Sequence, residues 1–154
     1  MENNISKNGF TLIELLIVAS ILSVVIAGII NLYIYTSVAA QLAGNKTLAV
    51  SEAQSKIEEI RNHTFDDITV DYTSGGTPGN TFSLSQLNGI GVIYIDSSNA
   101  ELLEIEVIVS WQDKYNRVIG EDLDLDGILD AGEDVNGNGK LDSIIKVESM
   151  VTRR

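Results

Sequence analysis

An apolar stretch from Gly9 to Gly44 constrains this chain most, because Glu14 is its only charged residue. From Leu15 to Ile30 the stretch consists almost entirely of Leu, Ile, Val, Ala and Ser. About 20 such residues in a helix span the hydrocarbon core of a bilayer, which is roughly 30 Å thick. A surface helix of a soluble protein normally carries a polar face, and this stretch has none. The sequence therefore predicts a membrane-spanning helix near the N-terminus.

A secretory signal peptide is the first alternative, but its apolar region normally covers about 7–15 residues and ends at a small-residue cleavage site. This stretch is longer and continues into uncharged sequence. An uncleaved single-pass anchor fits better, yet it leaves Glu14 unexplained, because a carboxylate inside the bilayer costs about 2.5–3.5 kcal/mol. A lone carboxylate could simply reach the headgroups. Its position instead favours a functional role with a cationic partner.

The residues around Gly9 resemble the processing site of type IV prepilins and pseudopilins. A short polar leader ends in Lys7, Asn8 and Gly9, and the sequence GFTLIE then runs from Gly9 to Glu14. A basic residue often precedes the glycine in that family, whereas Asn8 does so in this chain. The resemblance implies cleavage after Gly9 by a membrane aspartic peptidase, the prepilin peptidase, and N-methylation of Phe10. It also implies that Glu14 meets the freed N-terminal amine of a neighbouring subunit, which would supply its cationic partner.

The same resemblance implies where the chain works. Flanking charge leaves the orientation open, because Lys7 and Lys46 lie on opposite sides of the apolar stretch. The resemblance places the leader, residues 1–9, inside the cell, residues 10–44 in the bacterial inner membrane, and the head outside. After assembly the chain would belong to a periplasmic or cell-surface fibre. The implied partners are other pilin or pseudopilin subunits, the prepilin peptidase, the membrane and an inner-membrane assembly platform.

The composition limits what the rest of the chain can be. Of 154 residues, roughly 110 follow the apolar stretch, which is enough for one domain. The net charge of -12, with 10 basic residues, argues against direct binding of nucleic acid. The chain has no cysteine, so an exported head would need a stabilising device other than a disulfide. No nucleophile, acid–base pair or catalytic metal arrangement is visible, so we expect no enzyme.

The remainder predicts an α+β head, residues 45–154, with a small antiparallel sheet packed on the second half of the long helix. Apolar residues spaced by three and four continue the helix through residues 45–62, and their face should be buried: Ala49, Ala53, Ile57 and Ile60. Residues 63–89 are expected to be a loop. His63, the only histidine, is expected at the surface or at the helix end.

Alternating apolar residues predict strands at residues 90–96, 101–111 and 144–151, with 115–120 as an optional fourth, in a sheet region spanning 90–151. The second strand carries one apolar face, made of Leu103, Ile105, Val107, Val109 and Trp111. Glu104, Glu106 and Ser110 lie on the other face, which predicts a sheet buried on one side only. Trp111 is expected in the core. The helix end followed by a strand with Trp111 and Asp113 also looks, more weakly, like the minor-pilin branch.

Residues 121–143 form an acidic insertion with eight acidic residues and one basic residue. A solvated loop is the simplest interpretation, but the spacing matches a calcium-binding loop with Gly127 at its sharp turn. The expected ligands are Asp122, Asp124, Asp126, the carbonyl of Ile128, Asp130 and Glu133. A second, weaker unit offers Asp134, Asn136, Asn138, the carbonyl of Lys140 and Asp142, but Ile145 replaces its twelfth-position Glu.

The pair of units resembles the calcium repeats of exported bacterial modules and thrombospondin-type loops. We expect Ca²⁺ to order the insertion and to stabilise a cysteine-free head. Its dissociation constant should be roughly 10⁻⁴ to 10⁻³ M, as in extracellular modules. Leu129, at the eighth position of the first unit, is expected to anchor the insertion to the core.

These features predict a structural subunit of a type IV pilus or a type II secretion pseudopilus, and more specifically a minor subunit. The prepilin peptidase would process it, its apolar helix would assemble it, and calcium would stabilise its head. The alternative is a membrane-anchored extracellular calcium-dependent binding module that never polymerises. Cleavage after Gly9 separates the two, because a simple anchor does not need it. Pilus, secretion system and DNA-uptake system stay open as alternatives.

Overall fold

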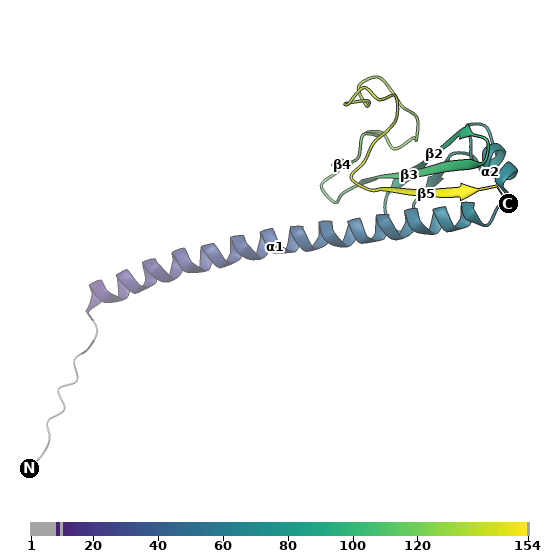
Figure 1. Ribbon diagram of the computed structural model, residues 1–154. Helices are drawn as coiled ribbons and strands as arrows, with labels where there is room; N and C mark the ends of the chain where they lie inside the picture. The colour runs from purple at the N-terminus through teal and green to yellow at the C-terminus, as the bar shows by residue number, and fades with distance from the viewer. Residues whose placement is uncertain (1–8, 10, 154) are drawn as a thin grey trace, which may run out of the picture. The chain divides into compact units, whose positions relative to one another are not determined.

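The computed structural model describes Gly9 and residues 11–153 of the 154-residue chain. The leader residues 1–8 and the predicted methylation site Phe10 therefore lie outside the described residues. The chain forms two compact units, of which the first ends at Gln41 and the second begins at Leu42. One helix, α1 (Leu12–Arg61), belongs to both units and is continuous through Gly28 and Gly44 (Figure 1).

The first unit is the apolar half of α1, in which every residue from Leu12 to Ser37 is exposed. Its few polar side chains hydrogen-bond to carbonyl oxygens of the preceding turn. Ser20 Oγ lies 2.7 Å from the oxygen of Leu16, and Asn31 Nδ2 lies 2.9 Å from that of Ala27. Such bonds satisfy polar groups that lipid could not. Among the described residues, α1 is the one helix that is long and apolar enough to cross a membrane.

The second unit is an antiparallel sheet packed on the remainder of α1. Its strands are β1 (Thr81–Ser83), β2 (Gly89–Asn99), β3 (Leu102–Gln112), β4 (Val118–Ile119) and β5 (Lys146–Thr152). Strand β3 is central, since β2 pairs along one edge while β4 and β5 share the other, and β1 extends the sheet beyond β2. This arrangement confirms the predicted α+β class.

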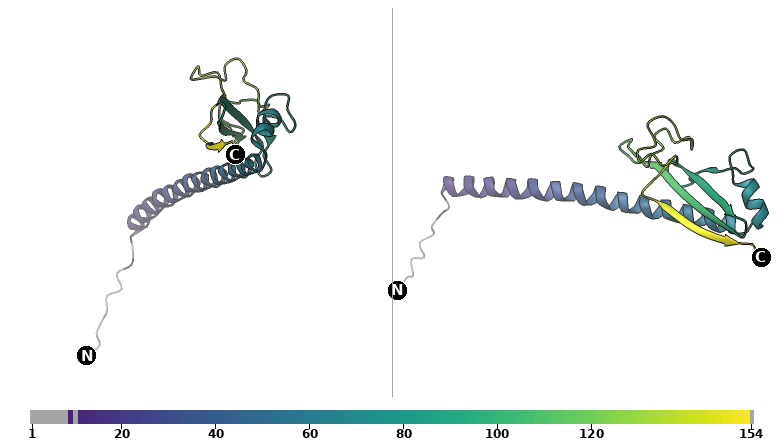
Figure 2. Two further views of the ribbon diagram at one scale, coloured as in Figure 1. Left: turned by 45° about the vertical axis from the view of Figure 1, so that its right-hand side comes forward. Right: turned by 45° about the horizontal axis from the view of Figure 1, so that its top comes forward.

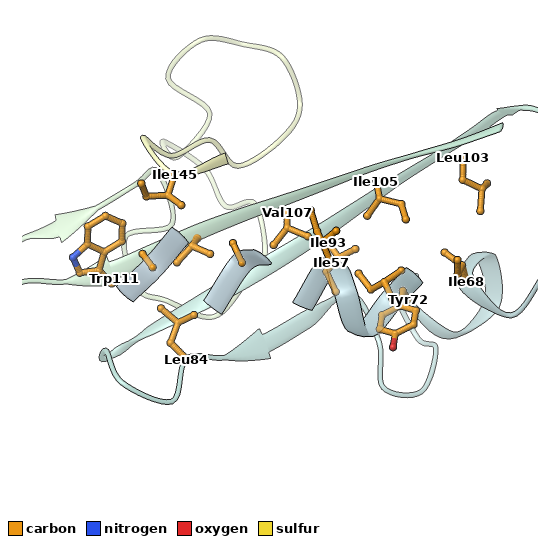
Figure 3. Close-up of a cluster of buried hydrophobic side chains, with 14 residues drawn as sticks. Ile57, Ile68, Tyr72, Leu84, Ile93, Leu103, Ile105, Val107, Trp111 and Ile145 are labelled. Carbon is orange, nitrogen blue, oxygen red and sulfur yellow. The ribbon is translucent and has the colours of Figure 1, made fainter. Parts of the chain in front are cut away.

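The core lies between β3 and α1. The apolar side chains on the helix-facing side of β3 are at most 1 % exposed, as the sequence predicted: Leu103, Ile105, Val107, Val109 and Trp111. They pack in one cluster with the predicted helix face, where Ala49 and Ala53 are small enough for close approach and Ile57 and Ile60 add apolar area. Figure 3 shows Trp111 and Ile145 at one end of this core and Leu103 and Ile68 at the other.

The prediction of a loop over residues 63–89 is wrong, because this segment contains α2 (Phe65–Asp71) as well as β1. Thr64 caps α2, accepting the N–H of Asp67 at 3.3 Å. Tyr72, at the end of α2, is buried, and its hydroxyl lies 3.0 Å from Nε2 of His63 and 3.3 Å from Oε1 of Glu59. Helix α2 has seven residues and β1 has three, too few for a period to stand out.

The prediction of a sheet buried on one side only is also wrong. On the outer face, which points away from α1, Ile108 is 1 % exposed and Ser110 is 3 % exposed. The acidic insertion covers this end of the face, lying on the opposite side of the sheet from α1 (Figures 1 and 2). A Cβ at Gly127 would approach Thr81 Cγ2 to 2.7 Å, which shows how closely the insertion packs. The other end of the outer face is uncovered and carries Glu104 and Met150.

Glu52 of α1 holds the loop between β1 and β2, since its two carboxylate oxygens accept the N–H groups of Ser85 at 2.7 Å and Gln86 at 2.9 Å. We expect Glu52→Ala to lower the free energy of unfolding by about 1–2 kcal/mol, because two charge-assisted bonds are lost. Urea unfolding of the full chain in detergent, followed by fluorescence of the buried Trp111, measures this. Glu58→Ala is the control, as Glu58 only pairs with exposed Arg61. Equal effects of the two substitutions would contradict the assignment.

Candidate functional site

The N-terminal end of α1 carries the predicted assembly residue Glu14. Its Oε2 accepts the backbone N–H and the hydroxyl of Thr11, each at 2.9 Å, while Thr11 Oγ1 accepts the N–H of Glu14 at 3.3 Å. This reciprocal pair is a capping box, which satisfies donors that the first turn of a helix leaves free. Glu14 therefore has a local role that the sequence analysis missed, although Thr11 three residues before Glu14 and an apolar run is its signal.

The capping role leaves Glu14 available for a partner. The three bonds to Thr11 are local and exposed, and hydroxyl and amide donors carry no positive charge. No lysine or arginine among the described residues forms an ion pair with Glu14. Gly9 is exposed and its surroundings are open, since a Cβ there would meet nothing within 4 Å. A peptidase could reach this position without displacing any described part of the chain.

The first half of the acidic insertion folds around Asp122. Asp122 is 0 % exposed, and its two oxygens accept the N–H of Asp126 at 3.2 Å and that of Gly127 at 2.9 Å. Asp124 also accepts the N–H of Asp126, and Asp126 accepts that of Ile128 at 2.7 Å. Gly127 has a φ of +79°, which favours glycine at this turn. Carboxylate oxygens of Asp122, Asp124 and Asp126 all lie within 4.8 Å of one another.

Glu133 closes this loop from its far end. It is 4 % exposed, and its oxygens accept the N–H of Leu123 at 2.7 Å and that of Asp130 at 3.0 Å. The predicted first and twelfth ligands are therefore both buried in the same loop. Asp130 is exposed, as is Ile128, whose carbonyl was predicted to be a ligand.

The electrostatics of this loop favour a cation. Burial raises the pKa of Asp122, and the negative charge of Glu133 adds to the rise, although N–H groups of Gly127, Leu125 and Asp126 act in the opposite direction. Within the described part of the chain, no lysine or arginine forms an ion pair with any of the predicted ligands of the first loop. Several uncompensated carboxylate oxygens gathered in one loop form a donor set suited to a hard divalent cation.

The second half of the insertion repeats the same backbone pattern twelve residues later. Asp134 accepts the N–H groups of Asn138 and Gly139, each at 2.9 Å, and Asn138 accepts that of Lys140 at 2.8 Å. Asp142 Oδ2 accepts the side-chain amides of Asn136 at 2.6 Å and Asn138 at 2.7 Å. Hydrogen bonds thus join Asp134, Asn136, Asn138 and Asp142 in one loop, which is more exposed than the first.

Glu121 is a candidate ligand that the sequence analysis missed. Its Oε2 accepts the N–H of Asp142 at 3.0 Å, and Glu133 Oε2 accepts the N–H of Asp130 at the same distance. Glu121, the residue directly before Asp122, thus closes the second loop with a carboxylate. Ile145, at the twelfth position of that loop, supplies none. The signal was present in the sequence, because Glu-Asp begins both twelve-residue repeats, at residues 121–132 and 133–144.

Hydrogen bonds and an ion pair attach the second half of the insertion to the sheet. Leu141 is buried, and its N–H donates to the hydroxyl of Tyr94 at 2.9 Å. The ammonium of Lys140 lies 2.9 Å from Glu106 of β3 and 5.0 Å from the centre of the Tyr94 ring. The predicted anchor Leu129 is only half-buried, and Leu141, its equivalent in the second repeat, is the deeper anchor.

Comparison with known proteins finds one similarity. A family model described as the prokaryotic N-terminal methylation motif matches residues 5–30, which include Gly9, Glu14 and the start of α1. No curated protein and no solved structure matches the chain. The chain therefore carries a prepilin-type methylation motif on a long apolar helix. These two features together are consistent with a type IV pilin-like protein, and they support anchoring in a membrane before assembly.

Glu106 links the insertion to the sheet in a way that acid should weaken. Partial burial raises its pKa, but hydrogen bonds from Lys146 and Lys140 outweigh burial, so that its pKa lies below the ordinary value. A carboxyl with a lowered pKa stabilises the fold above its unfolded pKa, and this contribution is lost as the pH falls through the folded pKa.

We therefore expect part of the free energy of unfolding to be lost as the pH falls below the ordinary glutamate pKa of about 4.3. In Glu106→Gln this part of the pH dependence should be absent. Urea unfolding at a series of pH values, with a chelator present throughout, measures it. Glu101→Gln, at an exposed position, should keep the wild-type pH profile. A profile of Glu106→Gln that parallels the wild type would contradict this role.

Proposed function

We propose that this chain is a structural subunit of a type IV pilus or a type II secretion pseudopilus. One observation carries the proposal: the methylation motif at residues 5–30 coincides with an apolar helix whose residues are all exposed as far as Ser37. A soluble protein does not leave such a surface uncovered, whereas lipid or a bundle of like helices would cover it. The motif implies processing by prepilin peptidase and assembly with other pilin subunits.

The proposed mechanism is an exchange of one apolar environment for another. Before assembly the apolar half of α1 would lie in the inner membrane, and afterwards it would pack against the helices of neighbouring subunits. Cleavage after Gly9 would free the amine of Phe10, and the carboxylate of Glu14 in the next subunit would pair with that amine. A buried carboxylate without a cation is strongly unfavourable, so the pairing favours one axial register of the subunits. The capping box with Thr11 would keep Glu14 at the helix end until then.

We further propose that the insertion binds Ca²⁺ and that the metal stabilises the head. Asp122, Asp124, Asp126, the carbonyl of Ile128, Asp130 and Glu133 would hold the first ion. The buried carboxylates without a basic partner support this assignment. In the second loop, Asp134, Asn136, Asn138, the carbonyl of Lys140 and Asp142 would hold another ion, with Glu121 in place of the missing twelfth ligand. Because Leu141 and Lys140 attach this loop to the outer face, ion binding would stabilise the sheet as well.

Glu14→Ala tests the assembly mechanism. We expect the variant to insert into the membrane as the wild type does, because removing a carboxylate favours insertion. Its incorporation into fibres should fall strongly, because the N-terminal amine of the neighbour would have no partner. Fractionation and imaging of a tagged copy measure both steps, with Ser20→Ala as the control on the same helix.

Mass spectrometry of the assembled chain should find N-methylated Phe10 as its first residue. An intact leader in a membrane-anchored, unassembled chain would instead support the alternative of a calcium-dependent binding module. Normal fibre incorporation of Glu14→Ala would refute the role given to Glu14 and leave the methylation result standing on its own.

Calcium removal tests the metal proposal. An ion at 100 times its dissociation constant adds about 2.7 kcal/mol per site, which should raise the Tm of a head of this size by roughly 10 °C or more. Thermal unfolding of the full chain in detergent, with calcium and with a chelator, should show this difference. Calorimetric titration should find two ions in the wild type and one in Glu121→Gln, with Glu101→Gln as the control. Equal midpoints with and without calcium would overturn the proposal for both loops.

A further inference from the structure

The uncovered end of the outer face holds a hollow of about 680 Å³. Acidic side chains of three strands line it, and Tyr94 and Met150 supply its apolar part. We call it the acidic hollow and define it by Asp96, Glu104, Glu106, Glu148, Tyr94 and Met150. The insertion forms one wall through Lys140. Met150 is 65 % exposed and offers an apolar surface at this hollow.

The charges of the acidic hollow are only half balanced. Lys146 lies 2.6 Å from Glu106 and 3.1 Å from Glu148, and Lys140 also bonds to Glu106. Asp96 and Glu104, in contrast, are direct cross-strand partners in β2 and β3. Neither forms an ion pair with a lysine or arginine of the described chain. Like charges directly opposite each other destabilise a sheet, so a cation from outside would stabilise this pair.

A cationic surface lies on the turn between β3 and β4. Lys114 Nζ and Arg117 Cζ lie 5.0 Å and 5.8 Å from the ring centre of exposed Tyr115, and these three residues define the basic turn. Asp113 makes the turn rigid, since it accepts the N–H groups of Tyr115 and Arg117 and pairs with the guanidinium of Arg117. Among the described lysines and arginines, Lys114 and Lys46 are the two that form no ion pair.

The two surfaces lie at opposite ends of β3. Glu104 is near the start of the strand, and the basic turn follows its last residue, Gln112, at the β4 end of the sheet (Figure 1). The rise of a strand puts them about 25 Å apart, so they do not meet within one head. Between two copies, however, the basic turn of one can meet the acidic hollow of the next. Such a head-to-tail contact leaves one free surface at each end, which is the condition for an open filament.

We propose that the basic turn of one copy docks in the acidic hollow of the next copy, with Lys114 facing Asp96 and Glu104, and the Tyr115 ring against Met150. Charge complementarity and the rigid presentation of the turn carry this assignment. The inference rests on the proposed function and deepens it, because it names the contact between heads. It also implies that copies of this chain follow one another along the fibre, in place of the minor position suggested by the sequence.

Disulfide cross-linking in cells that assemble the fibre tests this contact. The chain has no native cysteine, so Met150→Cys with Tyr115→Cys introduces one thiol at each surface and changes no charge. Because the two positions are about 25 Å apart in one head, a disulfide between them can only join two copies. Mild oxidation should give a ladder of dimers, trimers and longer species on a non-reducing gel. Each single-cysteine variant, as a matched control, should give no ladder.

Charge reversal on the double-cysteine background tests the complementarity. Glu104→Lys or Lys114→Glu alone should reduce the ladder by about tenfold or more, because each puts like charges together. The two together should restore it. A weaker ladder in Glu104→Lys would not be caused by unfolding, because the introduced lysine would face Asp96 across the strands and favour the sheet. Glu101→Lys, an equal charge change outside the acidic hollow, should leave the ladder unchanged.

The outcomes separate the inference from the proposed function. Fibres that contain the double-cysteine chain but yield no ladder would overturn the head contact and leave the subunit role standing. Cross-links to a different protein would likewise overturn a second copy as the occupant. A membrane-inserted chain with neither fibres nor ladder would overturn both. A ladder that needs both cysteines, is lost on either reversal and returns in the combined variant supports the contact.

Discussion

The packing of β3 on α1 is the interaction on which the rest of the head depends. A strand whose alternate side chains are all apolar, from Leu103 to Trp111, meets a helix face formed by Ala49, Ala53, Ile57 and Ile60. Strands β2, β4 and β5 all take their register from β3. The core of the head therefore includes the second half of α1, and under the proposed function the same helix would carry the head into an assembly.

The acidic insertion gives the sheet its second covered face. A sheet with one helix on one side would expose Val92 and Ile108 to water, yet both are buried. The insertion packs on this side of the sheet, where Gly127 lies close to Thr81 and Ile90. A cover made of loops buries little apolar area, so its rigidity depends on its internal bonds. Those bonds converge on the carboxylates of Asp122, Glu133, Asp134 and Glu121. Stability of the outer face is therefore tied to whatever neutralises these groups.

Sequence patterns foresaw the helix–sheet core, because α1 and β3 are long enough for their periods of 3.6 and 2 to be read without context. The spacing of the acidic residues also predicted the glycine turn at Gly127, while the calcium sites stay a prediction. Three features were not foreseen. Helix α2 is too short for a period, Ser110 is buried where Gly120 packs against its side chain, and Glu121 closes a loop that begins thirteen residues later. In the sequence, the only sign of such a long-range contact is a repeat, here the pair Glu-Asp that begins at positions 121 and 133.

The chain has 22 acidic and 10 basic residues, and the positions of the unpaired acidic residues matter more than their number. Most basic side chains of the head are committed to internal pairs, such as Lys146 with Glu106 and Arg153 with Asp66. Among the described residues, three places with carboxylates that form no ion pair with a lysine or arginine are Glu14, the insertion, and the pair Asp96 and Glu104. Under the proposed function each of the three meets a different external cation: an N-terminal amine, calcium, and a lysine of the next copy. Neutralisation from outside the isolated chain would then favour the helix register at Glu14, the stability of the head at the insertion, and the head contact at Asp96 and Glu104.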